Sequence, residues 1–210
     1  MKIAEIYKSL QGESYFSGLP CIFIRTAGCN LRCSYCDTKY AYRSGKILSV
    51  PKIISEIKKY KIKIVELTGG EPLLQDDINV LTDRLLKDGY SVLIETNGSL
   101  DISKLSPKAV KIMDIKCPGS KMDNKNCLEN VKYLTKNDEI KFVVSNRSDY
   151  NWAKRKIKEY SLDNKTKISF SAVSGSLPPE KLAGWILKDE LNVRFQIQLH
   201  KVLWPGKRRA

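Results

Sequence analysis

The stretch Ala27-Gly28-Cys29-Asn30-Leu31-Arg32-Cys33-Ser34-Tyr35-Cys36-Asp37 places three cysteines on one short loop, with the spacing C-x3-C-x2-C. Three thiolates at this spacing can hold three irons of a four-iron cluster and leave the fourth iron without a protein ligand. A substrate or cofactor can bind to an open iron of this kind. The loop therefore predicts an iron–sulfur cluster that takes part in chemistry.

Zinc and disulfide bonds are the alternatives for these thiols. A structural zinc site takes four ligands, usually as two pairs, but the chain has no second C-x2-C pair and only one histidine, His200. Cys117 and Cys127 remain as fourth ligands, at a spacing that is not typical of zinc sites. Disulfides are disfavoured because the N-terminus shows no apolar signal segment, which predicts a reducing cytoplasm. Cys21, Cys117 and Cys127 are expected to be buried or half-buried thiols.

Length and composition predict one domain spanning residues 1–210. Apolar residues make up 42% of the 210 residues, enough for a well-packed core. No apolar run approaches the roughly 20 residues that a membrane span needs. The net charge is +14, but the lysines are scattered, which favours a solvated basic surface over nucleic-acid binding; a basic entrance for an anionic small molecule is the alternative. The tail Lys207-Arg208-Arg209 adds to this charge.

Strand and helix patterns alternate along the chain. The predicted strands are 21–26, 64–68, 91–96, 110–116, 140–144 and 167–171. The predicted helices are 51–60, 76–88, 150–160 and 179–188, with a weaker one at 128–134. This alternation favours parallel strands joined by right-handed crossovers. A complete barrel usually takes about 250 residues, so we expect an α/β fold built as a partial TIM-like barrel of about six parallel strands.

Polar residues gather where the predicted strands end. They are Arg25, Thr68 to Pro72, Glu95 to Gly98, Asp114 to Lys116 and Ser171 to Ser174. Chemistry in parallel barrels lies at the carboxyl ends of the strands. Because the cysteine loop follows the first strand directly, it is expected on the same rim as these residues.

The run Gly69-Gly70-Glu71-Pro72 follows the second predicted strand. Two adjacent glycines alone indicate only a turn. Beyond a buried strand they also let a ligand approach the backbone closely, and Glu71 can accept a hydrogen bond from a ligand ammonium group. Beside the cysteine loop, this run predicts a ligand contact.

Together, Cys29-x3-Cys33-x-Tyr35-Cys36 and Gly69-Gly70-Glu71-Pro72 resemble the signatures of the radical S-adenosylmethionine (radical SAM) superfamily. The closer likeness is to the 7-carboxy-7-deazaguanine synthase family. It is carried by residues 9–14 (SLQGES), 23–31 (FIRTAGCNL), 36–38 (CDT), 95–98 (ETNG), 114–120 (DIKCPGS) and 198–201 (QLHK). The resemblance therefore runs nearly from one terminus to the other.

The resemblance implies a radical lyase reaction. A [4Fe-4S] cluster on Cys29, Cys33 and Cys36 would bind S-adenosylmethionine and, with one electron, split it to a 5′-deoxyadenosyl radical. That radical would take a hydrogen from C6 of 6-carboxy-5,6,7,8-tetrahydropterin, whose ring would contract to 7-carboxy-7-deazaguanine with loss of ammonia. The product is a precursor of queuosine and other 7-deazapurines. The resemblance also implies a magnesium ion, a reductant protein such as flavodoxin or ferredoxin, and a homodimer.

Residue roles follow from the same resemblance. Thr38, which the bare sequence would make a turn or cap residue, would offer its hydroxyl to Mg²⁺, which prefers hard oxygen ligands. The expected S-adenosylmethionine contacts are Tyr35, Gly70, Glu71, Asp114, Ile115, Lys116 and Ser171. The expected substrate contacts are Leu10, Gln11, Gly12, Glu13, Arg25, Thr68 and His200. A rim ion pair is the alternative for Arg25, and His200 is predicted on a late strand, in alternation with Gln196 and Gln198.

Two other functions remain open at this point. One is a radical SAM activase that places a glycyl radical on a partner protein; such an enzyme would lack the set Gln11, Glu13, Arg25 and His200. The other is a basic zinc protein that binds RNA, for which the high positive charge is the main support. Metal analysis and turnover with the pterin distinguish the three.

Overall fold

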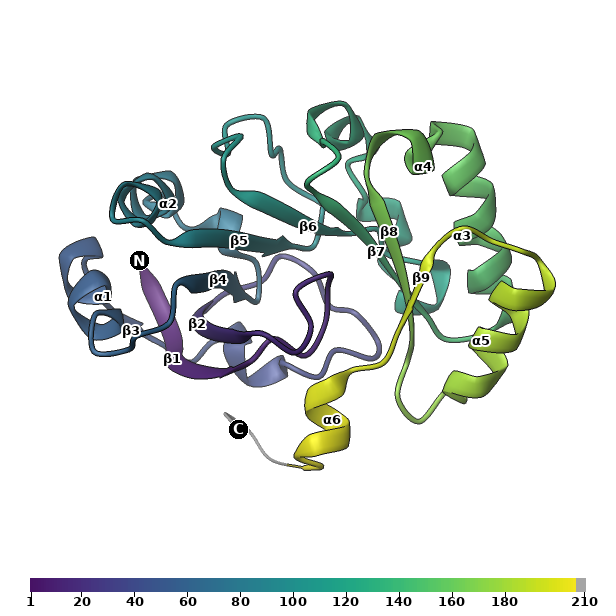
Figure 1. Ribbon diagram of the computed structural model, residues 1–210, viewed down its shortest axis with the longest axis horizontal. Helices are drawn as coiled ribbons and strands as arrows, with labels where there is room; N and C mark the ends of the chain where they lie inside the picture. Colours follow the sequence, from purple (N-terminus) through teal and green to yellow (C-terminus); the bar gives the residue numbers. More distant parts are fainter. Residues whose placement is uncertain (207–210) are drawn as a thin grey trace.

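A computed structural model describes residues 1–206, in which nine strands form one sheet (Figure 1). The strands are β1 (Lys2–Leu10), β2 (Pro20–Thr26), β3 (Lys46–Ile47), β4 (Ile64–Gly69), β5 (Ser91–Thr96), β6 (Val110–Asp114), β7 (Glu139–Val144), β8 (Lys167–Ala172) and β9 (Arg194–Gln196). Their order in the sheet is β3-β1-β2-β4-β5-β6-β7-β8-β9. The basic tail at 207–210 lies outside the described residues.

The six predicted strands are confirmed as β2 and β4 to β8, all parallel to one another. The short strand β9 extends this parallel set, while β1 and β3 form an antiparallel edge that the sequence analysis did not predict. In Figure 1 the sheet curls but leaves β9 and the β1–β3 edge apart, which is the expected incomplete barrel. The prediction that His200 lies on a late strand is wrong, because β9 ends at Gln196 and the chain turns into a short helix there.

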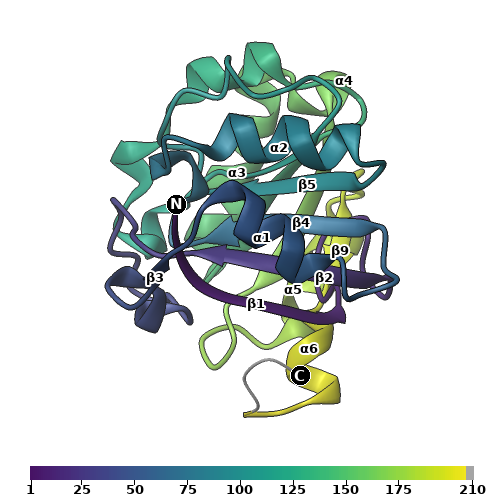
Figure 2. The same cartoon turned by 90° about the vertical axis from the view of Figure 1, so that its left-hand side faces the viewer.

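Within residues 1–206, six α-helices connect or follow these strands. They are α1 (Val50–Ile57), α2 (Ile78–Lys87), α3 (Arg147–Tyr160), α4 (Leu162–Lys165), α5 (Pro179–Lys188) and α6 (Leu199–Leu203). The four strongly predicted helices are confirmed as α1, α2, α3 and α5, whereas 128–133 forms a 3-10 helix. Figure 2 shows α1 and α2 side by side on the outside of the sheet. None of the helices described between residues 1 and 206 has the length and apolarity needed to cross a bilayer.

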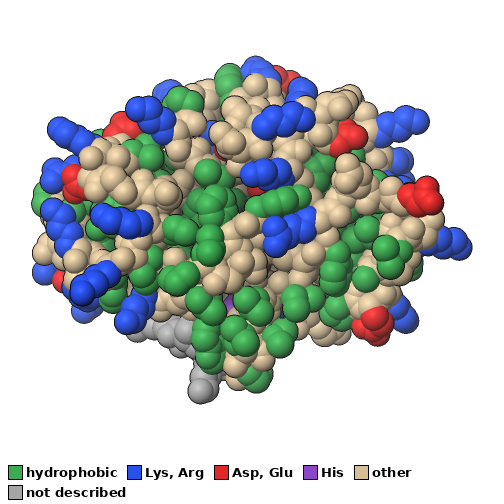
Figure 3. Space-filling model, in the orientation of Figure 1, with side chains coloured by type: hydrophobic (Ala, Val, Ile, Leu, Met, Phe, Trp, Pro, Cys, Tyr) green, Lys and Arg blue, Asp and Glu red, His purple; other side chains and the backbone are tan. Residues whose placement is uncertain are grey.

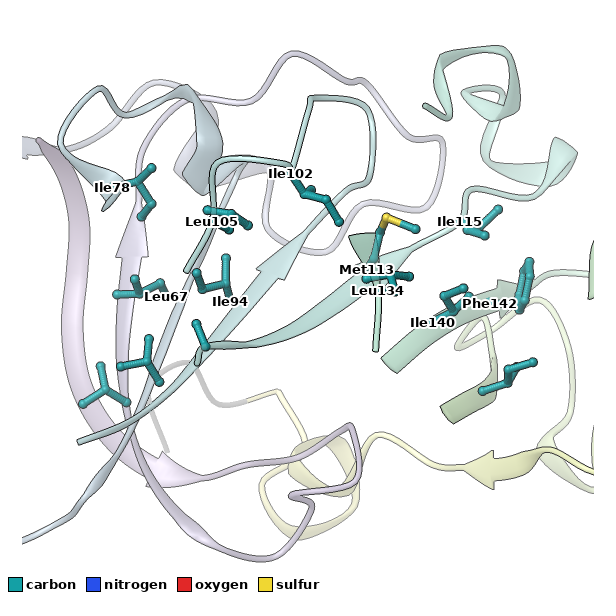
Figure 4. Packing of buried hydrophobic residues seen from close by; sticks show 14 of the residues in the cluster. Leu67, Ile78, Ile94, Ile102, Leu105, Met113, Ile115, Leu134, Ile140 and Phe142 are labelled. Carbon is teal, nitrogen blue, oxygen red and sulfur yellow. The ribbon is translucent and has the colours of Figure 1, made fainter. Parts of the chain in front are cut away.

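The two faces of the sheet differ in chemistry because side chains alternate along each strand. One set points to the helices and forms the core, including Leu67, Ile94, Met113, Ile140 and Phe142 (Figure 4). The set of opposite parity lines the concave face and is largely polar: it includes Glu5, Tyr7, Arg25, Glu66, Thr68, Glu95, Asp114, Lys141, Ser169, Ser171 and Gln196. Many of these polar groups are buried, and buried polar groups need partners or a ligand.

The outer surface carries the scattered basic charge that the sequence predicts. Figure 3 shows Lys and Arg side chains spread over the visible face among fewer acidic ones. Several lie over tyrosine rings; Lys63 Nζ, for example, is 5.1 Å from the ring centroid of Tyr90. This distribution fits a solvated basic surface on this side of the molecule.

The N-terminus of α3 offers a local test of the fold. Asn146 has extended backbone angles, and its side-chain oxygen accepts a hydrogen bond of 3.0 Å from the Asp149 amide. Asn146→Ala is expected to lower the free energy of unfolding by about 1 kcal/mol, which corresponds to a fall in Tm of roughly 2–4 °C. Thermal unfolding followed by circular dichroism measures the change. Asn124→Ala, at an exposed position in the short 3-10 helix Asp123–Lys125, is the control and should leave Tm unchanged.

Candidate active site

The cysteine loop begins directly after β2 and lies against the segment that follows β6. The Ser34 amide donates to the Ser120 carbonyl at 3.0 Å, and the Ser34 hydroxyl donates to the Gly119 carbonyl at 2.7 Å. Cys29, Cys33 and Cys36 are half-buried free thiols. The loop therefore presents all three sulfurs at the rim where the parallel strands end, as the sequence predicts.

Two N–H donors point to the Cys29 sulfur. The Leu31 amide lies 3.4 Å from Sγ, and the Asn97 side-chain amide lies 3.8 Å from it. Such donors suit a sulfur that carries negative charge, and hydrogen bonds to cluster sulfurs help to set the reduction potential of a cluster. The Asn97 contact was not predicted, and it links the end of β5 to the cysteine loop.

Burial raises the pKa of Cys29 and Cys33, so these thiols do not ionise readily by themselves. For Cys33, the nearby Lys116 ammonium opposes this rise. Thiolates must form when iron binds, so the metal's charge has to supply the stabilisation. Among residues 1–206, no group of three or more His, Cys, Asp or Glu side chains converges on a single-ion site. A four-iron cluster takes one thiolate per iron, so its ligands need not converge on one point.

The turn at Gly69-Gly70-Glu71-Pro72 packs directly under the cysteine loop. The Glu71 amide donates to the Gly28 carbonyl at 2.8 Å. A Cβ placed on Gly70 would lie 2.1 Å from the Gly28 oxygen and 2.8 Å from the Cys29 Cβ. Glycine is therefore required here by a close approach of two backbones.

The Glu71 carboxylate is hydrogen-bonded to other groups of the protein. It accepts hydrogen bonds from the Leu73 amide at 3.0 Å, the Thr96 hydroxyl at 2.8 Å and the Asn97 amide at 2.7 Å. Its side chain is buried, and burial raises its pKa to about 7 against these hydrogen bonds. Glu71 thus braces the turn against the end of β5, and the backbone of the turn is the better candidate for contact with a ligand.

The other expected cofactor residues lie at the ends of β6 and β8 and in the cysteine loop. Lys116 donates to Asp114 at 2.6 Å, and the Tyr35 hydroxyl donates to the Val143 carbonyl at 3.3 Å. The Ile115 side chain lies in the hydrophobic core, so only its backbone is available to a ligand. The Ser171 hydroxyl is buried and has no hydrogen-bond partner within the described protein.

Next to Ser171, a second polar side chain lacks partners. Gln196 pairs with Ser171 in the β8–β9 register, is buried, and has neither amide atom hydrogen-bonded within residues 1–206. Buried polar groups without partners are uncommon in native proteins. The adjacent hydroxyl and amide fit a ligand that offers both donors and acceptors on the concave side of the sheet.

The expected substrate residues at 10–13 come together with the C-terminal segment. Leu10 ends β1, and Gln11 to Glu13 follow it. The Leu199 amide donates to the Gly12 carbonyl at 2.9 Å, and a Cβ on Gly12 would lie 2.3 Å from His200 Nδ1. His200 is thus on α6 rather than on a strand, yet it still reaches the predicted neighbourhood.

Gln11, Glu13 and Thr68 join one polar network over the concave face. The Gln11 amide donates to Glu66, the Gln198 amide donates to Glu13 at 2.7 Å, and the Thr68 hydroxyl donates to Glu95 at 2.9 Å. Burial and the nearby Glu95 raise the pKa of Glu66 well above its ordinary value. The network therefore brings side-chain amides, a hydroxyl and carboxyl groups together on one face, which suits a ligand with mixed donors and acceptors.

Arg25 lies on the same concave face and is hydrogen-bonded to side chains of β1. Its Nε donates to Glu5 at 2.9 Å and its Nη2 donates to the Tyr7 hydroxyl at 3.2 Å. The structure shows the ion-pair alternative for this arginine, with the acidic partner supplied by the unpredicted strand β1. A substrate carboxylate would have to share or replace Glu5 as a partner of the guanidinium.

Thr38 lies just before a 3-10 helix at Lys39–Tyr42 and donates to Asp37 at 2.9 Å. Asp37 in turn forms an ion pair of 3.2 Å with Lys201, which donates to Gln198. Thr38 is therefore connected through Asp37 to the C-terminal segment that contacts Glu13. A hydroxyl beside a carboxylate is a pair of hard oxygen ligands of the kind that Mg²⁺ prefers.

Sequence reasoning missed Lys141 and Glu66 as site residues, and it placed Glu95 on the rim without giving it a role. Lys141 donates to Glu13 at 2.8 Å, also donates to Glu95, and lies 3.4 Å from Asp114. Burial would raise the pKa of Glu95, but the charge and hydrogen bond of Lys141 outweigh it and lower that pKa to about 2. The sequence did contain a signal for these residues. Each is a charged residue within a largely apolar strand, at a position whose side chain points to the concave face of the sheet.

Comparison with known proteins identifies the family of this chain. The radical SAM superfamily profile matches residues 23–115. A 7-carboxy-7-deazaguanine synthase from Koribacter versatilis is 42% identical, with 97% of each chain covered, and one from Clostridium acetobutylicum is 43% identical over 99% of this chain and 98% of the relative. The crystal structure of QueE from Escherichia coli superposes with a TM-score of 0.76 at 25% identity, covering 93% of both chains. On this evidence the chain is a radical SAM protein and belongs to the 7-carboxy-7-deazaguanine synthase family.

Proposed function

We propose that this chain is the 7-carboxy-7-deazaguanine synthase of a 7-deazapurine pathway such as that of queuosine. It acts as one domain and converts 6-carboxy-5,6,7,8-tetrahydropterin to 7-carboxy-7-deazaguanine with loss of ammonia. The observation that carries the proposal is the meeting of the cysteine loop, the Gly-Gly-Glu-Pro turn and the polar concave face on one rim of the sheet. Family membership over nearly the full length supports the same reaction.

The residues divide into those that hold the cofactors and those that hold the substrate. Cys29, Cys33 and Cys36 hold a [4Fe-4S] cluster, which together with S-adenosylmethionine supplies the radical that starts the reaction. For S-adenosylmethionine, the proposed contacts are Tyr35, Gly70, Glu71, Asp114, Ile115, Lys116 and Ser171, with Glu71 and Ile115 acting through the backbone.

The substrate lies over the concave face in this proposal. Gln11, Glu13 and Thr68 offer acceptors and donors to the pterin edge, and Leu10 and Gly12 contribute through the backbone. Arg25 binds the substrate carboxylate by exchanging its present contact with Glu5. His200 closes the pocket beside Gly12. The polar enclosure also orients the ring and limits the access of water during the reaction.

Thr38 is the proposed protein ligand of a magnesium ion. Thr38→Ala is expected to raise the Mg²⁺ concentration needed for half-maximal turnover by about tenfold or more, since loss of a supporting group at a metal site typically costs 10- to 100-fold. Magnesium titration of turnover, together with equilibrium binding of S-adenosylmethionine, measures the effect. Thr38→Ser, which keeps the hydroxyl, is the control. An unchanged magnesium response in Thr38→Ala would rule out this ligand.

The reaction itself is tested by anaerobic turnover of the reconstituted protein. With dithionite, S-adenosylmethionine, Mg²⁺ and the carboxytetrahydropterin, we expect the absorbance of 7-carboxy-7-deazaguanine to appear. Cleavage of S-adenosylmethionine without this product would contradict the proposal and favour a glycyl-radical activase. Protein that purifies with zinc, lacks iron and sulfide, and binds RNA in a salt-sensitive way would favour the RNA-binding alternative.

Partners and location follow from the same chemistry. A reductant protein such as flavodoxin or ferredoxin would supply the one electron that splitting S-adenosylmethionine requires. We infer a cytoplasmic setting, since cluster thiols need reducing conditions. A homodimer is proposed from the family resemblance. The substrate is a small molecule, and no nucleic acid is part of the proposed reaction.

A further inference from the structure

Lys141 is a charged residue in the middle of a buried strand. Its neighbours in β7, Ile140 and Phe142, point into the hydrophobic core, while Lys141 points to the concave face. The side chain is only 5% exposed. An isolated ammonium in such a place is strongly unfavourable unless it is paired, so its partners must account for its presence.

Three carboxylates from three separate segments surround this ammonium. Glu13 comes from the loop between β1 and β2, Glu95 from β5 and Asp114 from β6. Lys141 Nζ lies 2.8 Å from Glu13 Oε2, hydrogen-bonds to Glu95 Oε1, and lies 3.4 Å from Asp114 Oδ1. One positive charge thus fixes a loop to two strands and leaves an excess of negative charge around it.

The partners of Lys141 belong to the site but have different roles in it. Glu13 is a proposed substrate residue, and its second oxygen accepts from Gln198 of the C-terminal segment. Glu95 accepts from Thr68, another proposed substrate residue. Asp114 pairs with Lys116 on the cofactor side. Lys141 is therefore the common contact of residues that face the substrate and of one that faces the cofactor.

Neighbouring carboxyls on this face show what the ammonium does. Glu66 lies close to Glu95, and its pKa is raised by burial and by the charge of Glu95. Burial would also raise the pKa of Glu95, but the contact with the Lys141 ammonium outweighs burial and lowers that pKa to about 2. The contact with Lys141 thus distinguishes an ionised carboxylate from a neighbour that favours the neutral form.

We propose that Lys141 is a positioning residue that holds Glu13 and Glu95 side by side as hydrogen-bond acceptors for the N–H donors of a reduced pterin. This inference rests on the proposed function. A pair of carboxylates accepts the N–H and amino donors of such a ring through charge-assisted hydrogen bonds. Lys141 acts through these two carboxylates and not by contact with the reacting atoms. It thereby selects a ligand with a donor-rich edge over one with an acceptor-rich edge.

The test compares Lys141→Met with Lys111→Met. Lys111 is a matched control, because its side chain is 3% exposed and forms a 3.2 Å ion pair with Asp138. This pair lies where β6 and β7 begin, at the end of the sheet away from the proposed site. In Lys141→Met we expect the KM for the carboxytetrahydropterin, and the Kd of the stable analogue 6-carboxypterin measured by fluorescence, to rise about 10- to 100-fold, the range of one or two charged hydrogen bonds. S-Adenosylmethionine binding should change much less. Lys111→Met should lower Tm and leave both pterin constants unchanged.

A double-mutant cycle covers the case in which Lys141→Met does not fold. Lys141→Gln with Glu95→Gln removes both members of the pair and leaves no new unpaired charge between them. If Lys141 acts by holding Glu95, the effects of the two substitutions on KM will be non-additive. The KM of the double variant will then be no higher than that of the more impaired single variant. Additive effects, or a parental KM and Kd in folded Lys141 variants, would overturn the proposal. A fall in kcat alone would also overturn it. If the parent protein neither binds nor converts the pterin, the proposed function fails instead.

Discussion

Cys33→Ala protein is expected to lose the [4Fe-4S] cluster and all product formation. Cys33 is the central cysteine of the loop, and two thiolates cannot hold three irons of a cluster. We expect turnover to fall by more than about 100-fold, the upper range for groups that only support a metal ligand. Iron and sulfide analysis, the visible absorption spectrum after anaerobic reconstitution, and the product assay measure the loss.

Cys127→Ala is the matched control for this experiment. Cys127 is also a half-buried free thiol, but it follows a 3-10 turn outside the cysteine loop. The control should keep parental iron content and turnover. If Cys127→Ala lost metal and Cys33→Ala retained a cluster, the assignment of the three loop cysteines would be wrong and a mixed metal site would replace it.

Gly70→Ala is expected to have the second largest effect. The added Cβ would lie 2.1 Å from the Gly28 carbonyl oxygen and 2.8 Å from the Cys29 Cβ. Because the Gly28 oxygen is backbone and accepts from the Glu71 amide, the contact cannot be relieved by rotating a side chain. The cysteine loop must move away from the turn. Overpacking of this kind typically costs about 1–3 kcal/mol, so cluster retention or S-adenosylmethionine affinity should fall about tenfold or more.

Gly184→Ala separates this local clash from a general effect of adding a methyl group. Gly184 lies in α5, and nothing lies within 4 Å of a Cβ at that position. Alanine in a helix interior is favoured over glycine by roughly 0.5–1 kcal/mol, so this control should be slightly more stable and fully active. Parental cluster content and cofactor affinity in Gly70→Ala would show that the turn and the loop are not in firm contact.

The fold was largely predictable because its parallel strands are buried and marked by continuous β-branched runs. The runs at 64–68 and 91–96 became β4 and β5 almost without change in their bounds. The antiparallel strand β1 was missed because Glu5 and Tyr7 face the polar concave side, which weakens the apolar signal. The placement of His200 failed because alternation at Phe195, Ile197 and Leu199 resembles a strand, while hydrogen bonding to the Gly12 loop turns the chain into α6.

The site was predictable where a short sequence motif carries the chemistry. It was less predictable where tertiary contacts determine which side chains become partners. The cysteine loop and the Gly70 turn could be identified from spacing. The partners of the Arg25 guanidinium and the Glu71 carboxylate could not be identified from the sequence. Glu5 and Asn97 are brought next to them only by the pairing of strands in the folded sheet. Lys141 was overlooked because its meaning depends on three carboxylates that are 27 to 128 positions away in sequence.

The contact of Leu199 and Gln198 with Gly12 and Glu13 joins two segments that are about 185 positions apart in sequence at the proposed substrate pocket. During synthesis on the ribosome, the cysteine loop therefore emerges well before the segment around Gln198 that completes the wall of the pocket. A nascent or prematurely terminated chain that lacks this wall would contain every cluster ligand but an unfinished pocket.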